Sequence, residues 1–307
     1  MPSLDSTAGP ILIGAVLSTF LLGVASLQSF HYYRLYSSSG AAKALVGAVW
    51  CIEVGHSVAM WHAIYGMFVT FYGQIGHLAD PPHSIAFTVL FSAIINLLIQ
   101  SYFALRIHTL SRSWLIPSIC SSLTLARFVF NMFMLVGFWR SSGFVVFQTS
   151  LRWLMLCVSV IGPCVDVLTA ASLCFYLWKL RETMLEENEF AMVRDTRRMI
   201  DRIIVWSLET TSITSAAGVL QLILFITMPD NLAWSAVFLV QPKLFSNSML
   251  AHMHGRKQLK ASLDGRGAFT SSYARRIAGH GQLTSQMVFE SPPMSMPVTS
   301  TAHGQVV

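Results

Sequence analysis

The stretch Val165–Leu177, VDVLTAASLCFYL, decides how the rest of the chain must fold. It lies within an apolar run of about 26 residues, Trp153–Trp178, which is long enough to cross a bilayer as a helix at ~1.5 Å per residue. Asp166 is near the middle of this run. A carboxylate at the centre of a membrane helix costs roughly 2.5 to 3.5 kcal/mol, so we expect Asp166 to face other helices and to have a partner.

The composition of the whole chain indicates an integral membrane protein. Of its 307 residues, 54% are hydrophobic and 11% are charged, against roughly 45–50% and 25% in soluble domains. The formal net charge is +6, but 16 of the 20 Lys and Arg residues fall in three short loops and the C-terminal tail. This distribution is typical of cytoplasmic loops. Because we find no aromatic-basic module, we do not expect nucleic-acid binding.

Seven apolar blocks predict an all-α bundle of seven transmembrane helices. We expect Pro242 to break and kink the last of them, because proline lacks the backbone N–H that a helix needs. The predicted helices are Ile11–Phe30, Ala44–Phe68, Ser84–Leu105, Trp114–Phe138, Trp153–Trp178, Ile203–Met228 and Leu232–Leu250.

Charge near the helix ends predicts an outer N-terminus and a cytoplasmic C-terminus. The first ten residues contain Asp5 and no Lys or Arg, which favours a first transmembrane helix over a cleaved signal peptide. The links Tyr72–His83 and Pro229–Asn231 also lack basic residues and are expected to be outer turns. Arg140 and Arg152 flank a third outer loop and are the two exceptions to the charge rule.

Two regions of the chain are expected to extend into the cytoplasm. The segment Lys179–Arg202 has six basic and six acidic residues and is expected to continue helices five and six beyond the membrane. Residues 257–307 are rich in Ser, Gly, Pro, Met and Thr and are predicted to be a disordered tail, which leaves residues 1–256 as the transmembrane domain. Both regions are candidate sites for a cytoplasmic partner.

Depth along the helices identifies Arg127 and Asp166 as a candidate ion pair. At ~1.5 Å per residue, Arg127 lies about 20 Å from the inner boundary and Asp166 about 18 Å from it, on adjacent helices. Two opposite charges at one depth can hold neighbouring helices in register. We therefore expect the pair to be structural, with a functional role as the alternative.

A second group of charged residues lies closer to the cytoplasm. Glu53, Glu209 and Lys243 fall about 13, 9 and 10 Å from the inner boundary, and Lys243 has either carboxylate as a candidate partner. A lysine in a seventh helix invites comparison with the lysine that binds retinal in rhodopsins. A Schiff base requires a carboxylate counter-ion and an apolar pocket at mid-membrane depth, whereas Lys243 is near enough to the surface to snorkel.

Three further polar residues are candidates for helix contacts or for function. His56 shares a helix face with Glu53, which predicts a hydrogen bond between them or, alternatively, a proton-sensing pair. Asn96 and Gln100 are spaced i, i+4, so they can reach the same neighbour. Amides of this kind usually join helices by hydrogen bonds, and ligand contact is the alternative.

No catalytic or cofactor site is predicted. The chain has no GxSxG, HExxH or P-loop motif, so we do not expect an enzyme. The five cysteines all lie in predicted spans without metal-ligand spacing, and no metal or other cofactor is expected.

The sequence resembles a fungal family of seven-helix membrane proteins, known mainly from mushroom-forming fungi, that carries the domain of unknown function 6534. The resemblance is closest over about residues 162–256, where DVLTAASLCFYL, RIIVWSLETTSITS and PKLFSNSMLA occur in order and are followed by Arg256. LDSTAGPILIGAVLS, EVGHSVAMWHAIY and QSYFALRIHTLS, earlier in the chain, are similar as well. The resemblance implies the seven-helix membrane fold and no activity.

These observations leave three functional hypotheses. The first is a receptor-like protein of the plasma membrane or an endomembrane, in which a helical bundle in the lipid bilayer senses a ligand of unknown identity. The second is a transporter or channel that uses Glu53, Asp166, Glu209 and Lys243. The third is a membrane scaffold without a ligand. A cavity that reaches one side of the bundle would favour ligand binding, and one that reaches both sides would favour transport.

Overall fold

The computed structural model describes residues 4–35, 40–71, 83–140, 149–187, 191–228 and 231–254. The chain divides into two units, Met1–Gln258 and Leu259–Val307, and all described residues belong to the first. The predicted tail, 257–307, and most of the predicted outer link, Tyr72–His83, lie outside the described residues. So do Pro229 and Asp230 of the predicted turn after the sixth helix.

Seven long helical segments account for nearly all of the described residues, and none of these residues forms a β-strand. A short π-helix, η1 (Gly66–Thr70), directly continues the second helix. The other segments are α1 (Leu4–Leu35), α2 (Gly40–Tyr65), α4 (Ser84–Ser111), α5 (Leu115–Arg140), α7 (Arg152–Glu187), α8 (Ala191–Thr227) and the helix of residues 233–254.

Five of these helices are long and apolar enough to cross a membrane: Gly9–Leu35, Gly40–Thr70, Ser84–Ser111, Leu115–Arg140 and Arg152–Lys179. The sixth apolar segment, Thr211–Thr227 in α8, is shorter. Large apolar side chains such as Leu17, Phe20 and Phe133 are exposed on the surface of the bundle. An apolar surface of this kind fits contact with lipid and does not fit contact with water.

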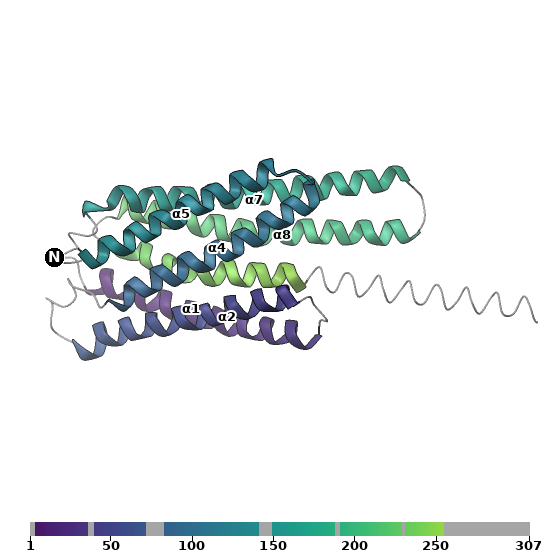
Figure 1. Ribbon diagram of the computed structural model, residues 1–307. Helices are drawn as coiled ribbons and strands as arrows, with labels where there is room; N and C mark the ends of the chain where they lie inside the picture. Colours follow the sequence, from purple (N-terminus) through teal and green to yellow (C-terminus); the bar gives the residue numbers. More distant parts are fainter. Residues whose placement is uncertain are drawn as a thin grey trace, which may run out of the picture. The chain divides into compact units, whose positions relative to one another are not determined.

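Consecutive helices run antiparallel, as contacts along their lengths demonstrate (Figure 1). Between α1 and α2, Trp50 Nε1 donates to Ser26 Oγ at 3.0 Å and Trp61 Nε1 donates to Thr19 Oγ1 at 2.9 Å. The same alternation brings the last helix parallel to α1. A Cβ added to Gly14 would lie 2.7 Å from Ala236 Cα near the start of both helices.

Helices α7 and α8 continue beyond the apolar spans, which confirms that the segment Lys179–Arg202 extends two neighbouring helices. The helix α7 has 36 residues and α8 has 37. At ~1.5 Å per residue each is about 55 Å long, against a hydrocarbon thickness of about 30 Å. Figure 1 shows the two helices side by side beyond the end of the others.

The last helix is continuous across Pro242, so the predicted break is wrong. Proline removes one backbone donor, but its neighbours Gln241 and Lys243 are both buried against other helices. This packing holds the helical backbone on either side of the proline, as transmembrane helices commonly allow.

The largest apolar core fills the half of the bundle away from the N-terminus of α1. It joins α1, α2, α4, α7 and residues 233–254, and none of its central side chains is more than 8% exposed. They are Ala25, Tyr32, Val46, Val49, Ile95, Ile99, Phe103, Ile107, Leu173, Phe245, Met249, Leu250 and Met253. These side chains pack densely, and the cavity among them that Phe103, Leu173 and Phe245 line has a volume of only about 20 Å³.

Candidate functional site

Lys243 and Glu53 form a buried ion pair between the last helix and α2. The Lys243 ammonium group donates to the Glu53 carboxylate and, at 2.9 Å, to the Glu53 backbone carbonyl oxygen. The hydroxyl of Ser246, one turn beyond Lys243, donates to the other carboxylate oxygen. Both charged side chains are almost completely enclosed. Glu209, the other partner considered for Lys243, is exposed on α8 and takes no part in this cluster.

His56 does not bond to Glu53, which corrects the predicted hydrogen bond within α2. Its ring is fully buried, and neither ring nitrogen has a hydrogen-bond partner among the described residues. The two oxygens of Glu53 already accept from Lys243 and Ser246. The last helix therefore provides the contacts that sequence spacing assigned to His56.

Asp166 is held by α4. Gln100 Nε2 donates to Asp166 Oδ1 at 2.7 Å, and Thr169 Oγ1, one turn along α7, donates to Gln100 Oε1 at 3.4 Å. The other carboxylate oxygen, Oδ2, is buried without a hydrogen-bond partner within the described part of the chain. Gln100 therefore joins helices, as predicted, while Asn96 does not share its partner, because Oδ1 of Asp166 accepts from Gln100 and its Oδ2 has no partner among the described residues.

Arg127 does not form the predicted ion pair with Asp166. The two groups are close enough to interact electrostatically, but within the described residues the guanidinium makes neither a salt bridge nor a hydrogen bond. The hydrogen bond that Asp166 does accept comes from Gln100. The guanidinium instead lies against the backbone of Gly162, where an added Cβ would be 2.9 Å from Arg127 Cζ.

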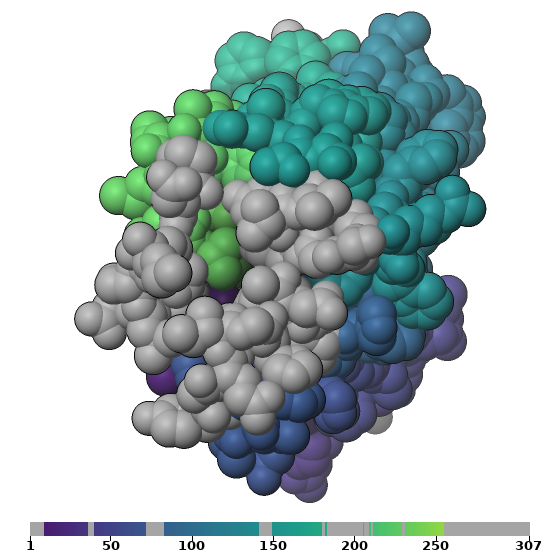
Figure 2. Space-filling model, turned by 90° about the vertical axis from the view of Figure 1, so that its left-hand side faces the viewer, coloured from purple at the N-terminus to yellow at the C-terminus, as the bar shows by residue number. Residues whose placement is uncertain are grey.

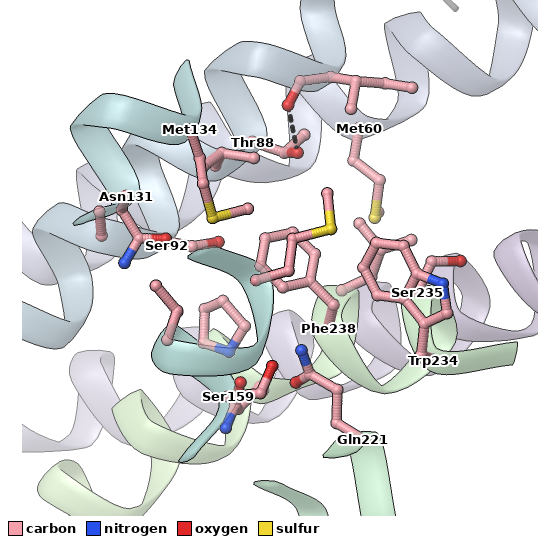
Figure 3. Close-up of a pocket in the computed structure, with 18 of the residues that line it drawn as sticks. Met60, Thr88, Ser92, Asn131, Met134, Ser159, Gln221, Trp234, Ser235 and Phe238 are labelled. Carbon is pink, nitrogen blue, oxygen red and sulfur yellow. Dashed lines mark hydrogen bonds between the residues drawn. The ribbon is translucent and has the colours of Figure 1, made fainter. Parts of the chain in front are cut away.

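A cavity of about 150 Å³ lies between the helices on the N-terminal side of these groups. This is roughly ten times the room that one water needs. All seven long helical segments contribute to its wall, and Figure 3 shows side chains from several of them converging on it. Its polar lining residues are Thr88, Ser92, Asn96, Arg127, Asn131, Ser159, Gln221, Trp234, Ser235 and Gln241.

The polarity of the cavity changes along its length. Arg127, Asn96 and Gln241 lie at the deep end. Helices α7 and α8 meet closely there, because a Cβ added to Gly218 would be 2.7 Å from Pro163 Cγ. The same Cβ would be 3.4 Å from Gln241 Nε2. Towards the helix ends the wall becomes mainly apolar. The apolar side chains there are Ile11, Ile64, Met67, Phe138, Phe225, Leu232, Phe238 and Leu239.

Among the described residues, the lining of the cavity extends towards the end of the bundle at which α1 begins and not towards the other end. Its lining includes Ile85 near the start of α4, Phe138 near the end of α5 and Leu232 before the last helix. Figure 2 is a view onto this end of the bundle. The start of residues 233–254 is green there, and the ends of α5 and α7 are teal. In the opposite direction, Pro242 is the last lining residue before the enclosed Lys243.

Of the polar residues that line the cavity, the sequence analysis identified Asn96 and Arg127 as candidates and did not identify the others. Thr88, Ser92 and Asn96 are spaced by four residues, as are Arg127 and Asn131, so each set forms one polar stripe on its helix. Reading these stripes together would have indicated two helices facing a shared polar space. Among the described residues, no group of three His, Cys, Asp or Glu side chains converges to hold a metal ion.

Residues 162–258 match the model of a family of unknown function, DUF6534. The matched segment contains Gly162, Asp166, Gln241 and Lys243, whereas Arg127 precedes it. The comparisons with curated proteins and with solved structures gave no match. The match covers about a third of the chain and brings no activity with it.

Proposed function

We propose that this multi-pass membrane protein is receptor-like and binds a small ligand in the cavity between its helices. The observation that carries the proposal is the cavity itself, which extends from mid-bundle to one end and has a polar inner wall. Apolar pockets with a few convergent polar groups are typical ligand sites, and helical bundles commonly hold them between helices.

The packing of the other half of the bundle supports ligand binding over transport. A transported solute needs a route to both sides of the membrane, whereas the second half of the bundle holds the large core, the Lys243–Glu53 pair and cavities of only about 10 and 20 Å³. Glu53, Asp166, Glu209 and Lys243, the residues considered for a transport path, do not line the cavity within the described chain. We therefore place transport second.

We further propose that the N-terminus is outside and the C-terminus is cytoplasmic. The concentration of 16 of the 20 Lys and Arg residues in the inner loops and tail supports this orientation. The cavity then faces the outside or the lumen, and the extended ends of α7 and α8 are in the cytoplasm. A cytoplasmic partner would meet the charged segment Lys179–Arg202. The fungal seven-helix family is the assignment that we favour for the whole chain.

The helix of residues 233–254 connects the cavity to the opposite end of the bundle. Trp234, Phe238 and Gln241 line the cavity, and Lys243 is paired with Glu53 directly below it. Farther along, His252 Nδ1 lies 2.7 Å from Nη1 of Arg106 on α4. A ligand that favours one position of this helix would thus change contacts at both ends, which is what a receptor requires.

The test is ligand-dependent stabilisation of the full chain, purified and reconstituted in nanodiscs. A panel of small apolar and amphipathic molecules is screened by thermal unfolding, and we expect some members to raise the unfolding temperature by mass action. In Ser92→Phe the ring occupies the cavity, so this stabilisation should disappear. Ser101→Phe is the matched control, because Ser101 is exposed on the same helix.

Two results would overturn the proposal. Stabilisation that survives Ser92→Phe would put the ligand elsewhere. Flux of the same molecules through vesicles that contain the protein would replace the receptor hypothesis with transport.

A further inference from the structure

The cavity holds a single ionised side chain among its described lining residues, and that side chain is Arg127. It is only 8% exposed and lies at the deep, polar end. Burying a guanidinium is costly unless its donors are satisfied, so proteins rarely leave one unpaired. Arg127 is such a case: its Nε is buried without a partner, and no described side chain bonds to the rest of the group.

The neighbouring acid leaves the hydrogen-bond donors of Arg127 unused. Asp166 attracts Arg127 electrostatically, but its Oδ1 accepts from Gln100 and the two groups are not in salt-bridge contact. Asp166 is also absent from the cavity wall. An anion that enters the cavity would therefore contact the guanidinium and not the carboxylate, whose charge acts on it only through space.

Other polar groups accompany Arg127 at this depth. The hydroxyl of Ser92 is buried and without a partner among the described residues. Asn131, one turn beyond Arg127, donates its amide to the Arg127 backbone oxygen at 2.8 Å, which fixes its side chain beside the cavity. Figure 3 shows Ser92, Asn131 and Ser159 on the same side of the cavity. Together with Arg127 they provide donors for the oxygens of one anionic head group.

The rest of the cavity suits an apolar tail. From Arg127 to Phe138 at the end of α5 is 11 residues, or about 16 Å along the helix axis. Met60, Met134 and Phe238 line this length, and Figure 3 shows them around the space. Flexible thioethers and an aromatic ring adapt to an apolar chain better than to a second charged group.

We propose that the cavity binds an apolar monocarboxylate, with its carboxylate on Arg127 and its tail directed towards the helix ends. This inference rests on the proposed ligand-binding function and specifies its chemical class. One carboxylate balances one guanidinium, and the planar fork of arginine binds it by two parallel hydrogen bonds. A phosphate dianion would bring a second negative charge for which this wall has no second cation.

The probes are decanoate, decanol and decylammonium, which share one tail and differ in the charge of the head group. Their affinities are measured for the full chain in nanodiscs made of neutral lipid, with empty nanodiscs subtracted. We expect decanoate to bind at least tenfold more tightly than decanol, the difference expected for hydrogen bonds to a charged group. Decylammonium should bind more weakly than either.

Variants on α5 assign this preference to Arg127. Arg127→Gln should reduce decanoate to the affinity of decanol and leave decanol itself unchanged. Arg127→Lys retains the charge without the fork and should recover part of the preference. Arg140→Gln makes the same change at an exposed arginine of the same helix and should behave like the unmodified protein.

The outcomes separate this inference from the proposed function. If decanol binds as tightly as decanoate, and Ser92→Phe abolishes both, the cavity binds ligands but the carboxylate assignment is wrong. If decanoate keeps its preference in Arg127→Gln, another group recognises the anion and the assignment is also wrong. If none of the three probes binds while the wider panel still stabilises the protein, the ligand belongs to a different class.

Discussion

Gln100 on α4 donates a 2.7 Å hydrogen bond to the carboxylate of Asp166 on α7, so an amide and not the nearby arginine holds the one acid in the middle of α7. This relationship joins two parallel helices that are far apart in the sequence. Arg127 lines the cavity, whereas Asp166 does not, and the second oxygen of Asp166 has no hydrogen-bond partner among the described residues.

Removing the Gln100 amide should destabilise the bundle. Gln100→Leu leaves the buried Asp166 without its hydrogen-bond donor, and the expected loss of stability is about 1 to 3 kcal/mol. Thermal unfolding in detergent measures the change. Ser101→Leu, at the exposed neighbouring position, should have almost no effect. Equal unfolding temperatures for both variants would contradict a structural role for this bond.

In the buried Lys243–Glu53 pair, the effect on stability of removing one charged side chain should depend on whether the other is present. Lys243→Met or Glu53→Leu alone leaves one uncompensated charge in the core and should cost roughly 3 to 5 kcal/mol. The double variant removes both charges and should recover most of that loss. Unfolding temperatures of the four proteins form a double-mutant cycle, and simple additivity of the two losses would show that the groups are not coupled.

The contact between α1 and the last helix should tolerate only glycine at position 14. A Cβ at Gly14 would lie 2.7 Å from the Cα and 2.8 Å from the backbone oxygen of Ala236, and neither atom can move without moving a helix. We expect Gly14→Val to lower expression and unfolding temperature. Gly23→Val on the same helix is the control, since an added Cβ there meets nothing within 4 Å. The same loss in both variants would mean that valine in α1, and not the close approach, is the cause.

Gly162→Ala should change ligand preference more than stability. Its new methyl group would lie within 3.2 Å of three guanidinium atoms of Arg127, and the end of a flexible side chain can move by a few tenths of an ångström. We therefore expect the preference for decanoate over decanol to fall several-fold while unfolding temperature changes little. The measurement is the same pair of affinities, with Gly23→Ala as the control. An unchanged preference would indicate that Gly162 does not position the guanidinium.

The sequence predicted the helical segments well because apolar runs of membrane length are strong signals. The α7 span follows from the length of the apolar run at ~1.5 Å per residue, and the extension beyond Lys179 follows from the change to charged residues. Helix ends were less accurate: α4 continues to Ser111, six residues past the predicted Leu105, because amphipathic residues such as His108 are compatible with a helix beyond the apolar core.

Side-chain partners were harder to predict, because depth gives height along a helix but not direction around it. Arg127 and Asp166 do lie on adjacent helices, yet the rotation of α4 brings Gln100 to the carboxylate first. Glu209 was counted as buried from its place in the sequence, whereas it is exposed on α8. His56 was paired with Glu53 within α2, although a residue 190 positions away occupies that carboxylate. Contacts between distant helices decide these cases.

The pairing of Lys243 with Glu53 also attaches the middle of the last helix to α2. Lys243 lies ten residues from the start of the helix of residues 233–254 and eleven from its end, so each arm is about 15 Å long. Because Lys243 ties the middle of this helix to α2, we expect a sideways displacement of Trp234 to be transmitted along the helix to His252. The contact between His252 and Arg106, near the other end of the helix, is the one that we expect such a displacement to change first.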